Sequence, residues 1–431
     1  MDKIKVGILG LGTVGTGVAK VLINNHDSIA KKVGKPVELV KVLVNDTKKQ
    51  RSISLPAGVL TDKPQDVLDN PNIDIIVEVM GGIDPTKDYI IKALKNGKQV
   101  VSANKDLIAT SGKELFNVAK EKNSDLLFEA SVAGGIPIIR PLKECLAGNK
   151  LDRVMGIING TTNYILTKMT QEGSAFGQVL KEAQDLGYAE ADPTADIEGY
   201  DAAKKIAVLA SIAFGTRITF SDVYVEGVTK IAPEDIRYAK ELGYVIKLLG
   251  IANNVNDQVE VRVHPAFVPK NHPLAAVNDV FNAIFVKGDA IGEAMFFGRG
   301  AGEMPTASAV VGDVITAARN ITYGTTGRIS CTCFEQKPII DMANVQSEYY
   351  IRLEVTDKPG VLASITSVLG DHNVSIATVI QKNINKKDRA ELILITHKID
   401  EHSINSALDI IGNMPTIGSI SNVIRVERGG E

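Results

Sequence analysis

Residues 1–130 alternate short β-branched runs with helical patterns, and this alternation restricts the fold more than any other feature. The apolar runs are IKVGILG, PVELVKVLVND, IDIIVEVM, QVVSANK and DLLFEAS, separated by helical patterns such as TVGTGVAKVLINNH and DYIIKALKNGK. Parallel strands joined by crossover helices produce this pattern, because helices then cover both faces of each strand. The pattern predicts an α/β domain with a doubly wound parallel sheet.

The rest of the chain predicts two further domains. Residues 131–335 mix strand-like runs (DRVMGIING, QVEVRVHPAFV, NAIFVKG, AMFFGRG) with helical segments expected at 174–187, 201–215 and 233–250, which indicates an α+β domain. A further helix, near 306–320, is expected to pack back on the first domain. After a linker at 335–347, residues 348–431 follow a βαββαβ pattern, which is ferredoxin-like.

The composition limits the partners of the chain. Acids and bases are interleaved and the formal net charge is −3, so we expect neither nucleic acid nor membrane binding. The N-terminus enters a strand without a cationic leader, and no apolar run approaches about 18 residues, which predicts a cytoplasmic protein. Three cysteines cannot all pair; we expect them to be reduced, mostly buried and neither ligands nor nucleophiles.

A glycine-rich turn, GLGTVG at 10–15, follows the first predicted strand and begins a helix. Gly10 permits the tight turn, Gly12 lets backbone N–H groups approach a pyrophosphate, and Gly15 lets helix and strand pack closely. The context predicts a Rossmann-type dinucleotide site. After the second strand, Asp46 favours NAD, whereas the basic residues Lys48, Lys49 and Arg51 favour NADP.

Two lysines are candidates for the proton transfer that accompanies hydride transfer. Lys105 ends the segment SANK at the carboxyl end of a predicted parallel strand, where ligands bind in such sheets. Lys205 shares a helical stripe with Asp201 and Leu209. Partial burial disfavours the charged amine and Asp201 favours it, so this amine can exchange a proton near neutral pH. A lysine that only forms a salt bridge with Asp201 is the alternative.

Carboxylates and a glycine turn surround the start of this helix. Fixed carboxylates would bind a substrate ammonium group, and the candidates are Glu190, Asp196 and Asp201. Asp192 precedes a proline and suits a helix start. The turn NGTTN at 159–163 can hold a substrate carboxylate and can equally cap the next helix. The stretch FGRGAGEMPTASA at 297–309 is also glycine-rich, and its helix N-terminus could meet the cofactor.

Together, GLGTVG, SANK, NGTTN, GYAEADPTADIEGYDAAKK and GRGAGEMPTA, in this order, resemble the homoserine dehydrogenase family, of the bacterial type with a C-terminal ACT domain. The resemblance covers essentially the whole chain and is most specific over residues 187–205. It implies NAD(P)-dependent interconversion of L-homoserine and L-aspartate 4-semialdehyde, on the route to threonine, methionine and isoleucine. Because no aspartokinase module precedes the chain, we expect a monofunctional enzyme.

The resemblance also implies roles for particular residues. Lys205 matches the proton donor or acceptor, and Lys105 matches a lysine beside cofactor and substrate. The amino-acid site is matched by Glu190, Asp196, Asp201 and Thr161. The cofactor contacts are matched by Gly10, Thr13, Val14, Gly15, Lys105 and Gly302. Asn45 stands where relatives that use NADP often have arginine; NADP or NAD is expected, with NADP slightly favoured.

Further implications concern an ion, an effector and assembly. A sodium ion is implied in a loop matching Glu129, Val132, Gly134 and Ile136, largely through backbone carbonyls. The segments DKPG at 357–360 and NVS at 373–375 match ACT-domain loops that bind a small amino acid, with L-threonine as the expected inhibitor; a dimerisation domain without ligand is the alternative. A homodimer or higher homo-oligomer, built through the central domain, is also implied.

Two other functions stay open at this point. One is a catalytically silent regulator that senses dinucleotide and amino acid, although such a sensor would not need paired lysines. The other is a related amino-acid dehydrogenase with a different substrate, because a carboxylate cluster that binds an ammonium group does not measure side-chain length.

Overall fold

The computed structural model describes residues 3–383 and 388–428. The chain divides into two compact units, and each is described by itself. The first comprises Met1–Val154, Lys204–Asp222 and Asn282–Gln336; the second comprises Met155–Ala203, Val223–Phe281 and Lys337–Glu431. The division into three domains at 1–130, 131–335 and 348–431 stays a prediction.

The first unit contains a six-stranded sheet in the order β3-β2-β1-β4-β5-β6, and every pairing in it is parallel. Its strands are β1 (Ile4–Leu9), β2 (Val37–Leu43), β3 (Leu60–Thr61), β4 (Ile75–Glu78), β5 (Gln99–Ser102) and β6 (Leu126–Leu127). The chain runs outward in opposite directions from β1 and β4, which makes the gap beyond their carboxyl ends the topological switch point. This arrangement confirms the predicted Rossmann-type sheet.

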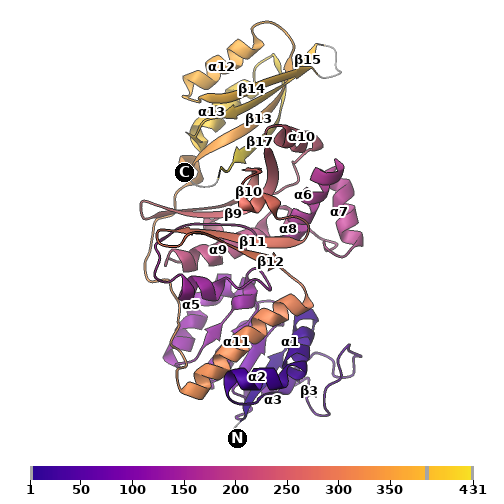
Figure 1. Cartoon of the computed structure of the whole chain (residues 1–431), viewed down its shortest axis with the longest axis vertical. Helices are drawn as coiled ribbons and strands as arrows, with labels where there is room; N and C mark the ends of the chain where they lie inside the picture. Colours follow the sequence, from indigo (N-terminus) through magenta and orange to yellow (C-terminus); the bar gives the residue numbers. More distant parts are fainter. Residues whose placement is uncertain (1–2, 384–387, 429–431) are drawn as a thin grey trace. The chain divides into compact units, whose positions relative to one another are not determined.

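Helices cover this sheet, and one of them comes from much later in the chain. The helices are α1 (Thr13–Asn24), α2 (His26–Val33), α3 (Gln65–Leu68), α4 (Thr86–Lys95), α5 (Lys105–Glu121) and α11 (Glu303–Tyr323). Helix α11 lies beside α1 (Figure 1), and its Val310 and Val314 share a buried core with Val18. A Cβ on Gly17 would lie 2.7 Å from the Glu303 carbonyl oxygen, so glycine permits this close approach.

The remaining elements of the first unit follow the sheet. They are the short helices η1 (Glu129–Ser131), η2 (Pro141–Cys145) and η3 (Phe220–Asp222) and strand β12 (Gly292–Arg299). The segment DLLFEAS was predicted as a strand, but only Leu126 and Leu127 pair, because the chain turns into η1. The boundary between the units falls within β7 (Leu151–Ile157), α9 (Tyr200–Ala213) and β11 (Phe281–Gly288).

The second unit contains strands in the order β9-β10-β17-β13-β15-β14. Its elements before the C-terminal region are α6 (Gly160–Glu172), α7 (Phe176–Asp185), α8 (Thr194–Ile197), β8 (Tyr224–Val225), α10 (Pro233–Glu241), β9 (Tyr244–Val255), β10 (Gln258–Pro269) and η4 (Pro273–Ala276). The helix predicted at 233–250 is therefore wrong beyond residue 241. Gly243 has φ +86°, which ends the helix, and the apolar run after it pairs antiparallel with β10.

The C-terminal region has the predicted βαββαβ order. Its elements are η5 (Met342–Asn344), β13 (Gln346–Thr356), α12 (Val361–Asp371), β14 (Ile376–Asn383), β15 (Arg389–Thr396), β16 (Ile399–Asp400), α13 (Glu401–Gly412) and β17 (Ile417–Val426). Helices α12 and α13 lie on one face of the sheet (Figure 1), where Ile365 and Ile404 pack on Leu353 and Leu392. This confirms the predicted ferredoxin-like unit.

Candidate active site

The glycine turn after β1 has the geometry that a dinucleotide requires. Gly10 has φ +96°, and a Cβ on Gly15 would lie 2.2 Å from the Gly10 carbonyl oxygen. Both positions therefore demand glycine for the fold itself. Gly12 differs, because a Cβ there would meet nothing within 4 Å. A side chain at Gly12 would therefore point into open space.

The N-terminus of α1 is suited to an anion. Gly12 is the N-cap residue, no side chain caps the helix, and the first turn contains no acidic residue. Gly12 and Thr13 are exposed. The first N–H groups of a helix have no intrahelical partner, and the helix dipole adds positive potential at this end. Thr13 and Val14 occupy this turn, and Gly302, with φ +118°, begins α11, which packs on α1.

The loop after β2 leaves the choice of dinucleotide open. Asn45 is exposed directly beyond the strand, and the Gly10 N–H donates to the Leu43 carbonyl at 3.0 Å, which keeps this end near the glycine turn. Asp46 accepts the Lys48 N–H at 2.8 Å. Arg51 folds back and donates to the Asp46 carbonyl at 2.5 Å. Both charged side chains thus bind the loop's own backbone.

A buried carboxylate that the sequence analysis missed holds the segment before Lys105. Glu78 ends β4, is fully buried, and accepts the Ser102 hydroxyl at 2.6 Å and the Met80 N–H at 2.9 Å. Ser102 in turn accepts the Asn104 N–H at 3.1 Å, and Asn104 caps α5. Burial raises the pKa of Glu78. The sequence did contain a signal for this residue, because Glu78 is a charged residue at the end of an otherwise apolar strand.

Helix α5 begins with Lys105, and an ion pair joins its first turn to α9. Lys204 Nζ lies 2.8 Å from Asp106 Oδ1, with both side chains about half-buried. Lys205 is also half-buried. The next turn of α9 contains Val208 and Leu209, which are buried. The two predicted catalytic lysines therefore stand on helices that are directly connected.

In the second unit, one amide joins two of the predicted substrate-binding carboxylates. Asn159 Nδ2 donates to Asp196 Oδ1 at 2.6 Å and to Asp201 Oδ2 at 3.0 Å. Its Oδ1 accepts the Thr162 N–H at 2.9 Å and so caps α6. Of the two uses foreseen for this turn, helix capping is the one that the contacts of Asn159 confirm. The cluster presents two carboxylates side by side, each half-buried.

Of the other two predicted substrate residues, Glu190 lies between α7 and α8, and Thr161 lies in the first turn of α6. Glu190 is exposed, and its carbonyl accepts from Gln184 Nε2 at 3.1 Å. Thr161 donates its hydroxyl to the Tyr188 carbonyl at 2.7 Å. Asp192 accepts from the backbone and hydroxyl of Thr194, which lowers its pKa and starts α8, as the sequence suggested. Neither Glu190 nor Thr161 belongs to the Asn159 cluster.

The loop implied to hold sodium has an unusual backbone. Ala133 and Gly134 have φ +58° and +53°, and a Cβ on Gly134 would lie 2.4 Å from the Gly300 carbonyl oxygen. The Glu129 carboxylate accepts three N–H groups, from Ile138, Ile139 and Arg140, at 2.5–2.8 Å. A carboxylate has about four lone-pair sites, so one is left. The binding of sodium by this loop stays a prediction.

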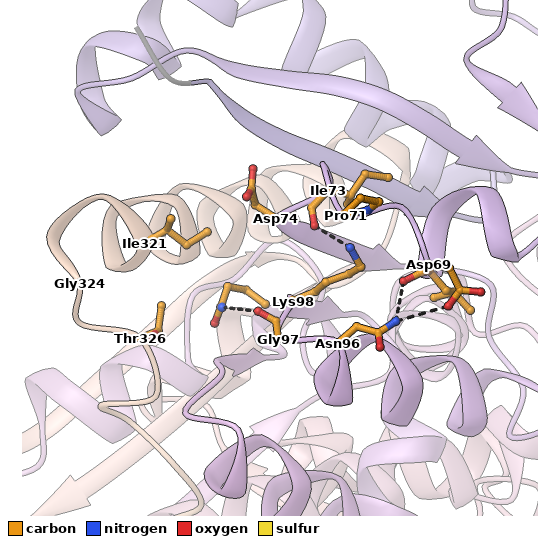
Figure 2. A pocket seen from close by; sticks show the side chains of 12 residues that line it. Asp69, Pro71, Ile73, Asp74, Asn96, Gly97, Lys98, Ile321, Gly324 and Thr326 are labelled. Atoms are coloured by element: carbon orange, nitrogen blue, oxygen red, sulfur yellow. Dashed lines mark hydrogen bonds between the residues drawn. The ribbon is translucent and has the colours of Figure 1, made fainter.

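Two further observations limit what the described residues can bind. Among them, no group of three His, Cys, Asp or Glu side chains is arranged to hold a metal ion. A cavity of about 640 Å³ lies beside Asp74 and Lys98, which precede β4 and β5 (Figure 2). Lys98 Nζ donates there to the Ile73 carbonyl at 2.8 Å. This cavity is at the amino ends of the strands, opposite the glycine turn, and lies outside the candidate site.

The cysteines differ from the sequence expectation. Cys145, Cys331 and Cys333 are not disulfide-bonded, but Cys145 is exposed and the other two are half-buried. The expectation that they are mostly buried is therefore wrong. In addition, no helix within residues 3–383 and 388–428 combines the length and apolarity needed to cross a bilayer.

An open glycine turn on a Rossmann-type sheet, a lysine at its carboxyl edge and a ferredoxin-like C-terminal domain define a nicotinamide-dependent oxidoreductase with a regulatory module. Family models for homoserine dehydrogenase match residues 137–315, for its NAD-binding domain residues 10–129, and for the ACT domain residues 349–415. The chain belongs to the homoserine dehydrogenase family.

Individual relatives agree with this assignment. The homoserine dehydrogenase of Bacillus subtilis is 45% identical, over 100% of both chains. The crystal structure of a homoserine dehydrogenase from Thiobacillus denitrificans superposes with a TM-score of 0.93 at 44% identity, covering 99% of each chain. A hyperthermophilic archaeal homoserine dehydrogenase in complex with NADPH has a TM-score of 0.63 at 28% identity, and covers 73% of this chain and 97% of its own.

Proposed function

We propose that this chain interconverts L-homoserine and L-aspartate 4-semialdehyde, with NADP or NAD as the redox partner. The observation that carries the proposal is the arrangement of α9. Asp201, bound to Asn159 together with Asp196, stands one helical turn before Lys205. One helix thus presents a carboxylate for an ammonium group and an amine for proton transfer to the same substrate.

The cofactor, when bound, supplies or accepts the hydride at C4 of the substrate. The proposed cofactor residues are Gly10, Gly12, Thr13, Val14, Gly15, Asn45, Lys105 and Gly302. The open space at Gly12 and the uncapped start of α1 support a pyrophosphate there. NADP is slightly favoured, because the archaeal relative binds NADPH and the basic residues Lys48, Lys49 and Arg51 follow β2.

The chain's own side chains hold the amino acid and move the proton. Asp196, Asp201 and Glu190 bind the substrate ammonium group, and Thr161 contributes to the same site. Lys205 donates a proton to the aldehyde oxygen during reduction and removes it from the hydroxyl during oxidation. Lys105 assists beside the reacting oxygen, held in place by the contacts of Glu78, Ser102 and Asn104.

Several finer points of the proposal rest on family membership. The loop of Glu129, Val132, Gly134 and Ile136 holds sodium and fixes the segment that packs on Gly300. L-Threonine binds the ACT domain as feedback inhibitor, and the chain forms a homodimer or higher homo-oligomer in the cytoplasm. The three proposed domains are residues 1–130, 131–335 and 348–431. A silent regulatory sensor is not favoured.

The test is turnover of purified protein with L-homoserine and either NADP⁺ or NAD⁺ at alkaline pH, followed by the near-ultraviolet absorbance of the reduced nicotinamide. We expect activity with at least one cofactor, and none with L-serine or L-threonine as control substrates. Lack of turnover of homoserine with both cofactors would contradict the proposal and favour the sensor.

A further inference from the structure

A pair of thiols beside two basic side chains lies in the first unit. Cys331 and Cys333 are half-buried in a segment with neither helix nor strand. Arg217 Nη2 lies 3.4 Å from the Cys331 sulfur. Lys143 Nζ donates to the Ser330 carbonyl at 3.1 Å. The cluster therefore combines two sulfur atoms with two cationic groups in a partly exposed place, the setting in which cysteines become reactive.

The surroundings favour a thiolate at one of the two positions. The Cys333 thiol hydrogen-bonds to Cys331 and lowers the pKa of Cys331, and the positive charges of Arg217 and Lys143 act in the same direction. The same bond raises the pKa of Cys333, which stays a thiol. Burial lowers the pKa of Lys143, so Arg217 is the more permanent of the two charges. These shifts favour a thiolate at Cys331 and a thiol at Cys333.

The thiols face a small cavity that can admit an oxidant. The cavity measures about 40 Å³ and is lined by both cysteines, Lys143 and Arg217. This volume can hold one or two molecules of the size of water, and hydrogen peroxide is not much larger than water. Hydrogen-bond donors around the cavity can stabilise a leaving hydroxide.

The same cavity touches the helices of both predicted catalytic lysines. Ile108 and Ala109 of α5 line it, as do Val208 and Ile212 of α9. Beyond the thiols, the Glu335 N–H donates to the Gly215 carbonyl at 3.0 Å, just after the end of α9. A change in the conformation of residues 331–333 would therefore act directly on the packing of these two helices.

We propose that Cys331 and Cys333 form a peroxide-reactive dithiol that closes to an intramolecular disulfide and thereby lowers turnover. The Cys331 thiolate attacks one oxygen of hydrogen peroxide; the O–O bond breaks, the S–O bond of a sulfenic acid forms, and hydroxide leaves and takes up a proton. The Cys333 sulfur then attacks the sulfenic sulfur, the S–O bond breaks, and the thiol proton leaves with the hydroxide as water. Two thiols lose two electrons to one peroxide.

The local backbone allows the ring to close. Only Thr332 separates the two cysteines. Consecutive Cα atoms are about 3.8 Å apart, so those of Cys331 and Cys333 cannot be further apart than about 7.6 Å, and a bend at Thr332 brings them within the range of about 4.4–6.8 Å that a disulfide requires. A dithiothreitol-type reductant would reopen the bridge.

The test treats the full chain with hydrogen peroxide and analyses tryptic peptides without reduction. We expect the peptide that starts at Ile329 to become lighter by two hydrogens, and kcat to fall at least about threefold and to recover with dithiothreitol. In Cys333→Ser, the sulfenic acid at Cys331 should persist and react with dimedone. In Arg217→Gln, the reaction should slow about tenfold or more, as expected when a thiolate loses its cation.

Cys145→Ser is the matched control, because Cys145 is an exposed thiol on a different peptide. This variant should oxidise and lose activity like the wild type. Faster oxidation of Cys145 than of Cys331, or bridges only between chains, would overturn the dithiol. A closed bridge with unchanged kcat would overturn its effect on turnover. The peptide masses do not depend on the substrate, so failure here is distinct from failure of the proposed dehydrogenase activity.

Discussion

Two adjacent lysines on α9 allow the proposed proton transfer to be tested at a single position. Lys205→Ala should lower kcat by about two to four orders of magnitude, because it removes a general acid and base, while cofactor binding stays nearly unchanged. Lys204→Ala is the control: its ion pair with Asp106 is about half-exposed, and such pairs contribute about 1 kcal/mol or less. Steady-state kinetics of both variants is the measurement.

The opposite ranking would contradict the assignment. If Lys205→Ala lost less than about tenfold in kcat, Lys205 would be a structural salt-bridge partner. If Lys204→Ala were the more damaged variant, the ion pair between α9 and α5 would matter more than the amine of Lys205.

Single side chains also show what a sequence can and cannot reveal. The glycine turn, SANK and the acidic stretch before α9 were recognisable because each has a residue type at a fixed spacing. The residues that bind these segments from elsewhere in the chain were not recognisable in the sequence. Glu78 contacts Ser102 from a different strand, and Asn159 contacts Asp196 and Asp201 from a different helix. Contacts between segments far apart in the chain have no local signature, and neither has a site made of carbonyl groups.

At the scale of the strand, turn and helix, substitutions at the two glycines should affect different properties. A side chain at Gly12 should weaken cofactor binding, whereas one at Gly15 should lower the stability of the fold. Gly12→Ala places a methyl group in open space at φ −78°, which alanine adopts readily, so stability should change by about 0.5 kcal/mol or less. The affinity for the cofactor should fall at least about tenfold, because the methyl group occupies the space of the pyrophosphate. Thermal unfolding and fluorescence titration with NADPH and NADH measure the two effects.

Gly15→Ala is the matched variant at the third glycine. Its methyl group would lie 2.2 Å from the Gly10 carbonyl oxygen, so the turn itself must shift, and we expect a loss of about 1–3 kcal/mol or more in stability. A Gly12→Ala protein that binds both cofactors like the wild type would show that the pyrophosphate lies elsewhere.

Strand β10 carries a histidine that should make the protein sensitive to acid. His264 is fully buried; Arg262 Nε donates to its Nε2 at 3.1 Å, so the proton is on Nδ1, which faces the Pro265 carbonyl. Burial, together with Arg425 and Arg262, holds the pKa of His264 well below its usual value. The unfolded chain takes up this proton below about pH 6.5 and the folded chain does not, so stability falls as the pH drops.

The measurement is the free energy of unfolding between about pH 6.5 and pH 5 for wild type and His264→Gln. An imidazole that stays neutral contributes a slope of about 1.4 kcal/mol per pH unit, which the variant should lack whatever its absolute stability. Equal slopes in the two proteins would mean that His264 does take up the proton in the folded state.

The secondary structure was predictable where the apolar residues followed one clear repeat, either that of a strand or that of a helix. The parallel strands of the first unit and the C-terminal βαββαβ order follow from clear alternation. The error at 233–250 has a local cause: YVIKLLG continues the apolar pattern of α10, but Gly243 adopts a left-handed backbone and the β-branched run pairs over twelve residues with β10. The segment alone is compatible with both a helix and a strand, and pairing with β10 makes it a strand.

Across the second unit, the ACT domain is joined to the elements before it by a sheet and by buried charges. Strand β17 pairs parallel with β10, and the rings of Phe267 and Tyr350 stack at 4.4 Å. Arg352 bonds Asp235 at 2.7 Å and Glu391 at 3.0 Å, all three well buried. Removal of one member of a buried ion pair leaves an uncompensated charge, which costs about 3–5 kcal/mol. Deletion of residues 348–431 should therefore destabilise the remainder.

A test of regulation consequently needs an intact ACT domain. We expect Asp357→Ala and Asn373→Ala to weaken inhibition by L-threonine at least about tenfold, because both side chains are exposed on the loops proposed to hold the amino acid. Turnover without threonine should be unchanged, since neither residue contacts the Arg352 cluster. Asp409→Ala, an exposed carboxylate on α13, controls for loss of charge. If inhibition persisted in both loop variants, threonine would have to act at another site, because a ligand shifts a conformational equilibrium only through the contacts in which the two states differ.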